Sequence, residues 1–249
     1  MNPRFRTTLR RLTAPAAAAL LLASAAGGAM AAGNSAIDLR NPALTDTPGS
    51  TPSIAPTPSG LGIGAIKQYQ GAVVLDSAIL LKVYYYAFSK QPVDYSAILT
   101  ANTEMIDPPK PVVPTAADKS ALDAMITFAR AHPNIVIRVD DIALDAYVAD
   151  GGYYPLDNRL FIHGVGYYFD NSPYHYAYLH PEGFRHLHCT DAATRKTIDA
   201  AIANYVHYKM DIYATINGAN VADKSLLVTV RNVALRDDIG NTLITQSAS

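Results

Sequence analysis

The spacing of apolar residues predicts two helices in the second half of the chain. The first spans residues 115–131, where apolar side chains recur every three or four positions and Thr115 with Asp118 has the spacing of a capping box. The second spans residues 191–204, with Thr190 as its expected N-cap. Its expected inward-facing side chains are Thr194, Ile198, Ala201, Ile202 and Tyr205.

Alternation of apolar and polar residues predicts strands around these helices. The clearest strand is 206–216, in which His207, Lys209, Asp211, Tyr213 and Thr215 are expected to share a wet face. Residues 226–235 are its expected neighbour, and a turn over 237–241 leads to a final strand at 242–245. Further strands are expected at 135–137, 142–149, 160–169 and 174–179.

The segment 66–88 is strongly apolar and is interrupted by Asp76 and Lys82. Its centre predicts a helix, whereas its end, Val83 to Tyr86, suits a helix or a strand equally. The two charges and the length argue against a membrane span. A short helix is expected after Asp94, through residues 98–99.

Strands that follow one another through turns indicate an antiparallel sheet. With two or more helices packed on it, the sheet defines an α+β fold. We expect one such domain over residues 65–249, with its clearest core at 115–245. Residues 32–64 are rich in proline, serine and threonine, and they predict a disordered linker because they contain few apolar side chains.

The first 31 residues have the organisation of a bacterial signal peptide. Four arginines and no acid precede an apolar run over residues 14–26, and Ala29-Met30-Ala31 supplies small residues for a peptidase. The Arg10-Arg11 pair lacks the fuller twin-arginine motif, which favours ordinary secretion. We therefore expect cleavage between Ala31 and Ala32, and a soluble mature chain in the periplasm or the medium.

Charge and cysteine content narrow the class further. The whole chain has a net charge of −1, and loss of the four leader arginines makes the mature chain more acidic. No basic run follows residue 40, which argues against a nucleic-acid partner. Cys189 is the only cysteine, so no internal disulfide can form. No membrane span is expected after cleavage.

Histidines are concentrated between His163 and Cys189. If the chain at residues 185–188 is extended, His186 and His188 project from one face and form a candidate pair of metal ligands. His175, His180 or Cys189 are then candidates to complete a zinc or copper site. The alternative is that these histidines are structural or lie scattered on the surface.

Cys189 is also a candidate catalytic nucleophile. It precedes the predicted helix at 191–204, whose N-terminus would favour a thiolate, and His186, His188 or His207 are possible bases. Alternation along a strand places His188 on the face opposite Cys189, which argues against this role. The alternative is a small buried thiol.

Tyrosine is abundant, with 16 residues, and tryptophan is absent. If exposed together, the tyrosines of the central region would form a binding face for a peptide or a glycan. The alternative is packing against the sheet. The candidate binding residues are Tyr153, Tyr154, Tyr167, Tyr168, Tyr174, Tyr176 and Tyr178.

Two segments of the chain resemble an uncharacterised family of exported proteobacterial proteins, known as a domain of unknown function. The first is Tyr153-Tyr154-Pro155-Leu156, which follows Asp145-Ala146-Tyr147. The second is the ending around Leu227-Val228 and residues 233–241. The resemblance covers roughly residues 115–245. It implies export, and it carries no catalytic residues.

These observations favour a non-enzymatic binding or accessory module of the cell envelope, which binds another envelope protein or a peptide. The sequence contains no Gly-x-Ser-x-Gly, P-loop, dinucleotide or His-Glu-x-x-His motif. The alternatives are a histidine-based metal-binding protein and a hydrolase or thiol enzyme that depends on Cys189.

Overall fold

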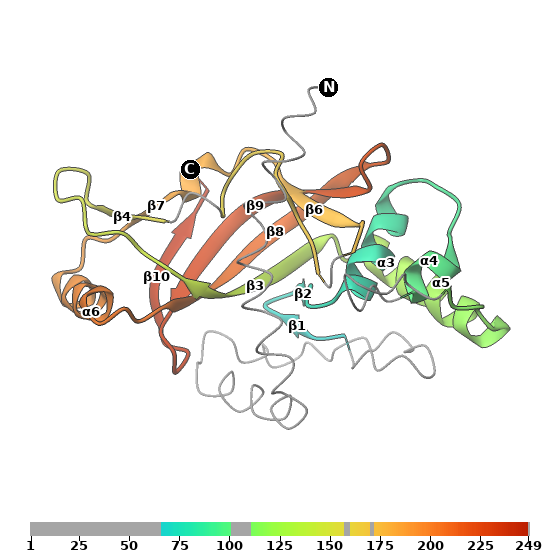
Figure 1. Ribbon diagram of the computed structural model, residues 1–249, viewed down its shortest axis with the longest axis horizontal. Helices are drawn as coiled ribbons and strands as arrows, with labels where there is room; N and C mark the ends of the chain where they lie inside the picture. Colours follow the sequence, from blue (N-terminus) through green and yellow to red (C-terminus); the bar gives the residue numbers. More distant parts are fainter. Residues whose placement is uncertain (1–65, 101–110, 157–159, 170–171, 249) are drawn as a thin grey trace. The chain divides into compact units, whose positions relative to one another are not determined.

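A large mixed sheet organises the α+β fold (Figure 1). The computed structural model describes residues 66–100, 111–156, 160–169 and 172–248. Within these ranges the sheet has eight strands, which run β1-β2-β3-β8-β9-β6-β5, with β10 also paired to β9. The predicted signal peptide and linker lie outside the described residues. The strands of the large sheet are β1 (Gln68–Tyr69), β2 (Ala72–Val74), β3 (Asn134–Ile142), β5 (Gly166–Tyr167), β6 (His175–Tyr178), β8 (Tyr208–Asn220), β9 (Ser225–Arg236) and β10 (Thr242–Ser247).

The predicted α+β fold is confirmed, but two pairings of the sheet expected to be antiparallel are parallel. β2 runs parallel to β3, with Val73 opposite Ile135, and β6 runs parallel to β9, with Tyr176 opposite Leu226. Parallel neighbours need long connections. The described part of the connection between β2 and β3 contains three helices, and the chain between β6 and β9 contains β7, α6 and β8.

The three helices between β2 and β3 are α3 (Ala78–Phe88), α4 (Tyr95–Leu99) and α5 (Ala116–Ala131). Val83 to Tyr86 belong to α3, which settles the choice between strand and helix. All but two of its residues are buried, because α3 lies against α5 and against β8 and β9. A helix covered on several sides has no polar face, so its sequence shows no clear helical period.

The predicted start of α5 is confirmed. Thr115 Oγ1 accepts a hydrogen bond from the Asp118 N–H at 3.1 Å, and Asp118 Oδ2 accepts one from the Thr115 N–H at 3.0 Å. These bonds form the capping box. The Thr115 hydroxyl lies 2.7 Å from Asp118 Oδ2, and its hydrogen bond, followed by that of the Thr115 N–H, lowers the pKa of the Asp118 carboxyl. The predicted short helix at α4 is also present, with Asp94 as its N-cap.

Helix α6 (Ala192–Ala203) begins one residue after the predicted start at residue 191. Asp191, not Thr190, is the N-cap, and its Oδ2 accepts a hydrogen bond from the Thr194 N–H at 2.6 Å. Of the side chains expected to face inward on this helix, Ile198 alone is fully buried. Tyr205 is 90% exposed, since it follows the helix in a left-handed conformation with φ +55°.

Strand β8 shows the predicted alternation of buried and more exposed residues, except at Asp211. Tyr208, Met210, Ile212, Ala214 and Ile216 are buried, as expected. Asp211 is buried as well, on the side predicted to be wet. Its carboxylate lies between Arg138 of β3 and Arg236 of β9, with N–O distances of 3.4 and 2.5 Å. Val206, where the strand was predicted to begin, lies two residues before β8 and is exposed.

Two predicted strands are mostly irregular. Within the predicted strand 142–149, the residues after Ile142 make only isolated bridges, of Leu144 with Leu156 and of Val148 with Tyr153. Within 160–169 the only strand is the two-residue β5. Both segments fold over the core and are rich in apolar and aromatic residues. The same composition is typical of strands, and for this reason the sequence predicts strands there.

The C-terminal meander is confirmed. β8, β9 and β10 are antiparallel neighbours, and the turn before β10 is closed by Asp237, whose Oδ1 accepts the Asn241 N–H at 2.7 Å. A second, two-stranded sheet pairs β4 (Tyr153–Pro155) with β7 (His186–His188). Of the described helices, none is long and apolar enough to cross a bilayer.

Candidate functional site

Three ring side chains lie side by side on the exposed face of the small sheet, and we call them the imidazole–tyrosine row: His186, Tyr153 and His188. Tyr153 lies opposite His188 in the antiparallel register. Its ring stacks on His186 with centroids 4.1 Å apart and meets His188 edge-on at 5.8 Å. The segment is extended and the prediction that His186 and His188 project from one face is confirmed; that face is exposed.

The backbone beneath the row is held on both sides. Leu187, between the two histidines, is fully buried in the core, which fixes the opposite face of β7. Gln246 of β10 accepts the His188 N–H at 3.0 Å and donates to the Gly183 carbonyl at 2.9 Å. These contacts join the small sheet to the large one, so the row is carried on a rigid scaffold.

Gly151 leaves the space in which the Tyr153 ring lies. A Cβ at this position would stand 2.1 Å from Tyr153 Cε1. The ring is thus confined by the Gly151 backbone and by the stacked imidazole of His186. No sequence pattern distinguishes Gly151 from an ordinary turn glycine, because the contact depends on where the Tyr153 side chain points.

The other histidines of the chain are engaged elsewhere. His163 Nδ1 accepts the His180 N–H at 3.1 Å, and their rings are 4.8 Å apart. His175 packs on Gly166, and His207 contacts Asp141 through Nδ1. The described residues contain no group of three or more His, Cys, Asp or Glu able to hold a metal ion. The expected convergence of His175, His180 or Cys189 on the pair is not seen there.

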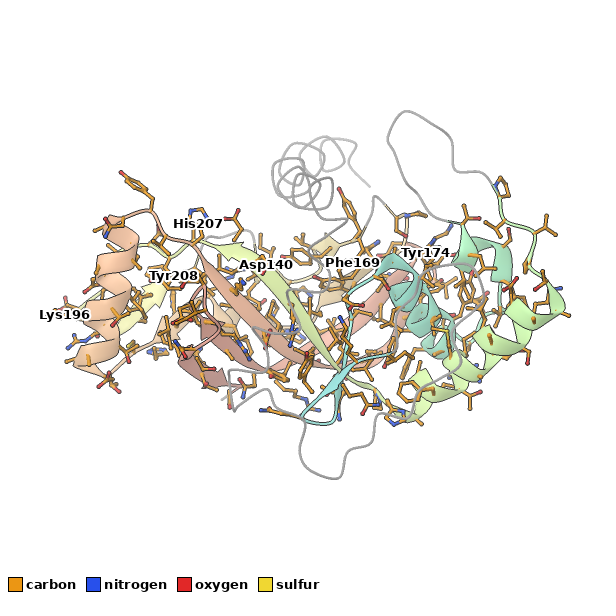
Figure 2. All side chains as sticks on the ribbon, turned by 90° about the horizontal axis from the view of Figure 1, so that it is seen from below. Asp140, Phe169, Tyr174, Lys196, His207 and Tyr208 are labelled. Carbon is orange, nitrogen blue, oxygen red and sulfur yellow. The ribbon has the colours of Figure 1, made fainter. Side chains whose placement is uncertain are left out.

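The His207–Asp141 contact lies where β3 ends and β8 begins. Asp141 has φ +68° beside an irregularity in the β3–β8 register, and both side chains are about half exposed. Figure 2 shows His207 close to Asp140 at this end of the strands. Sequence reasoning missed the pair, because a bulge that turns one carboxylate toward another strand leaves no local pattern.

Cys189 does not have the surroundings of a nucleophile. The residue is buried, its Sγ lies 3.7 Å from the Asp191 carbonyl oxygen, and burial raises the pKa of the thiol. A raised pKa leaves less thiolate at neutral pH, whereas a catalytic cysteine needs more. His188 is exposed on the side away from the buried thiol. The structure therefore favours a packing role for Cys189.

Of the two alternatives for the candidate tyrosines, the structure shows packing against the sheet for most of them and not one exposed face. Tyr154, Tyr174, Tyr176 and Tyr178 are buried, Tyr153 and Tyr167 are half-buried, and Tyr168 is 36% exposed. Most of these rings pack against one another and against the core because the strands that carry them cover it. Of the predicted set, Tyr153 is the member that belongs to the imidazole–tyrosine row.

A second tyrosine cluster lies around Tyr174, beside α3 (Figure 2). The hydroxyls of Tyr86 and Tyr174 are 2.8 Å apart, and Tyr85 meets the Tyr174 ring edge-on at 5.0 Å. Lys82, itself buried, donates to the Thr100 carbonyl at 2.6 Å and lies over the Tyr174 ring at 5.8 Å. The cluster joins α3 to β6, and it is part of the core.

Burial of the tyrosines makes the fold sensitive to alkali. Burial raises the pKa of Tyr167 and of Tyr208 to about 12, from 10.0. The folded state then holds protons that the unfolded chain loses above pH 10, so stability falls as the pH rises through about 12. We expect tyrosinate absorbance to appear together with loss of circular dichroism in a pH titration. Gradual ionisation of all tyrosines in a chain with native dichroism would contradict this.

Comparison with known proteins adds no relative. No protein-family model matches the chain, and no curated protein or solved structure matches it. The resemblance to exported proteobacterial proteins therefore stays a prediction.

Proposed function

We propose that this chain is an exported binding protein of the cell envelope, and that the imidazole–tyrosine row contacts its partner, another envelope protein or a peptide. The observation that carries the proposal is the row itself. Three ring side chains are presented together on a braced strand pair, with His186 and His188 exposed. Ring side chains already held by packing lose little conformational entropy when a partner binds.

The pattern of residues 1–31 supports the export half of the proposal, as does the family resemblance. When the full chain is expressed in a Gram-negative host, we expect its soluble form in the periplasm to begin at Ala32. N-terminal sequencing and fractionation measure this. Ala31→Arg is expected to block cleavage, because a signal peptidase requires a small residue there. Cytoplasmic, uncleaved chain with the natural sequence would contradict export.

Photocrosslinking tests the binding half. A benzophenone amino acid at exposed Thr190, close to the row in sequence, is expected to crosslink to an envelope protein or a peptide in the native host. The same probe at Tyr205, which is 90% exposed and outside the row, is expected to give no such product.

Two glycine variants make the experiment specific to the row. Gly151→Ala is expected to abolish the Thr190 crosslink, because the new Cβ displaces the Tyr153 ring. Gly183→Ala is the matched control, since its Cβ would meet nothing within 4 Å. A crosslink that survives both Gly151→Ala and Tyr153→Ala would refute the row as the binding surface.

A further inference from the structure

We propose that the imidazole–tyrosine row binds one divalent transition-metal ion, of the copper or zinc type, through the imidazoles of His186 and His188. This inference deepens the proposed function, since it names a ligand class for the same surface. It rests on three observations. The two imidazoles leave the same face of β7, their ring nitrogens make no hydrogen bond to the described residues, and the Tyr153 ring stacks on His186.

The placement of the two donors follows from strand geometry. His186 and His188 are two residues apart on β7, so their side chains leave the same face, separated by about 6.6 Å along the strand. Pairing with β4 and the Gln246 hydrogen bonds hold this strand in place. Two imidazoles on a rigid strand are thus presented together before any ion arrives.

The ring nitrogens of His186 and His188 are available. Among the described residues, neither ring makes a hydrogen bond, and neither forms an ion pair. By contrast, Nδ1 of His132, of His163 and of His207 is engaged with the Phe128 carbonyl, the His180 N–H and the Asp141 carboxylate, respectively. A histidine with free ring nitrogens on a braced strand is suited to ligation.

The donor set selects the class of ion. Imidazole nitrogen prefers Cu²⁺, Zn²⁺ and Ni²⁺, whereas Mg²⁺ and Ca²⁺ require several oxygen donors. Within the described part of the chain, no third His, Cys, Asp or Glu completes a group with this pair. The remaining coordination positions would therefore be filled by water or by a group from the partner.

Tyr153 is a positioning residue in this arrangement. Its ring stacks on His186 at 4.1 Å, with an angle of 18° between the two planes, which fixes the orientation of that imidazole. Gly151 in turn provides the space for the tyrosine ring. Groups that orient a metal-bound histidine typically change metal affinity by about 10- to 100-fold when removed.

The test is calorimetric titration of the untagged, full-length exported chain with Cu²⁺ and, separately, with Zn²⁺. We expect one ion per chain for at least one of these metals and no binding of Mg²⁺. His186→Ala and His188→Ala are each expected to weaken binding by at least ~10-fold. His163→Ala, in the histidine pair outside the row, is expected to leave it unchanged.

Tyr153 variants separate positioning from general damage. Tyr153→Ala is expected to weaken binding by ~10-fold, and Tyr153→Phe, which keeps the stacking ring, is expected to restore it. Circular dichroism of each variant verifies the fold. For Cu²⁺, electron paramagnetic resonance is expected to show nitrogen coupling that is lost in the double histidine variant.

Several results would overturn the inference. These are equal metal affinity in the natural chain and in the double histidine variant, an equal loss in His163→Ala, or no binding at all. If metal binding fails while the Thr190 crosslink persists, the metal site is refuted and the proposed partner-binding role stands. If the ion binds but the crosslink never forms, the partner-binding role is refuted and the metal site stands.

Discussion

Replacing Asp211 with alanine is expected to lower the free energy of unfolding by about 3–5 kcal/mol. The Asp211 carboxylate lies between Arg138 and Arg236, and both Asp211 and Arg236 are almost fully buried. Removing the carboxylate leaves the Arg236 guanidinium without its 2.5 Å partner in the centre of the sheet. Urea unfolding of the purified protein, followed by circular dichroism, measures the loss.

The matched experiment removes both charges of the closer pair. An Asp211→Leu, Arg236→Met variant is expected to be more stable than Asp211→Ala, because no buried charge is left uncompensated across that contact. A loss below about 1 kcal/mol in Asp211→Ala would mean that water reaches Arg236 and that the pair contributes as little as a surface salt bridge.

Replacing Tyr154 with alanine is expected to cost about 3–5 kcal/mol, as for other large aromatic residues removed from a core. Tyr154 is fully buried, and its ring packs on Tyr147 with centroids 5.0 Å apart. Its hydroxyl donates to Asp199 Oδ1 at 2.8 Å and lies 3.1 Å from the Arg195 carbonyl oxygen. The side chain therefore joins β4 to helix α6.

Two further variants separate the contribution of the Tyr154 ring to stability from that of its hydroxyl group and compare Tyr154 with Tyr153. Tyr154→Phe keeps the ring and is expected to cost about 1–2 kcal/mol, because it removes only the hydroxyl contacts. Tyr153→Ala, one residue earlier on the half-buried face, is expected to cost less than Tyr154→Ala. If Tyr153→Ala were the more damaging of the two, the assignment of Tyr154 to the core and Tyr153 to the surface would be wrong.

Features encoded by residues close in sequence could be predicted. The start of α5 depends on Thr115 and Asp118, three positions apart, and the alternation in β8 depends on one strand. The shared face of His186 and His188 follows from the same period of two. In each case the physical signal lies within one turn or one strand.

Features that depend on pairing between distant segments could not be predicted. Asp211 reads as a surface residue until the register sets it opposite Arg138 and brings Arg236 beside it. The imidazole–tyrosine row requires Tyr153 of β4 to lie opposite His188 of β7. Neither strand determines this register by its own sequence. The sequence left open whether Tyr176 and Tyr178 of β6 lie at the surface or pack against the sheet, and in the strand that pairs with β9 both are buried.

The order of the strands also determines when the fold can form. The two longest strands, β8 and β9, lie between β3 and β6 in the sheet, yet they come late in the chain. Until residues 208–236 have been synthesised, α3 can pack on α5 but not on β8 and β9, β3 lacks β8, and β6 lacks β9. Pairings between distant segments form slowly. The nascent chain therefore remains without its completed core for most of its synthesis, which is the state that the proposed export would require.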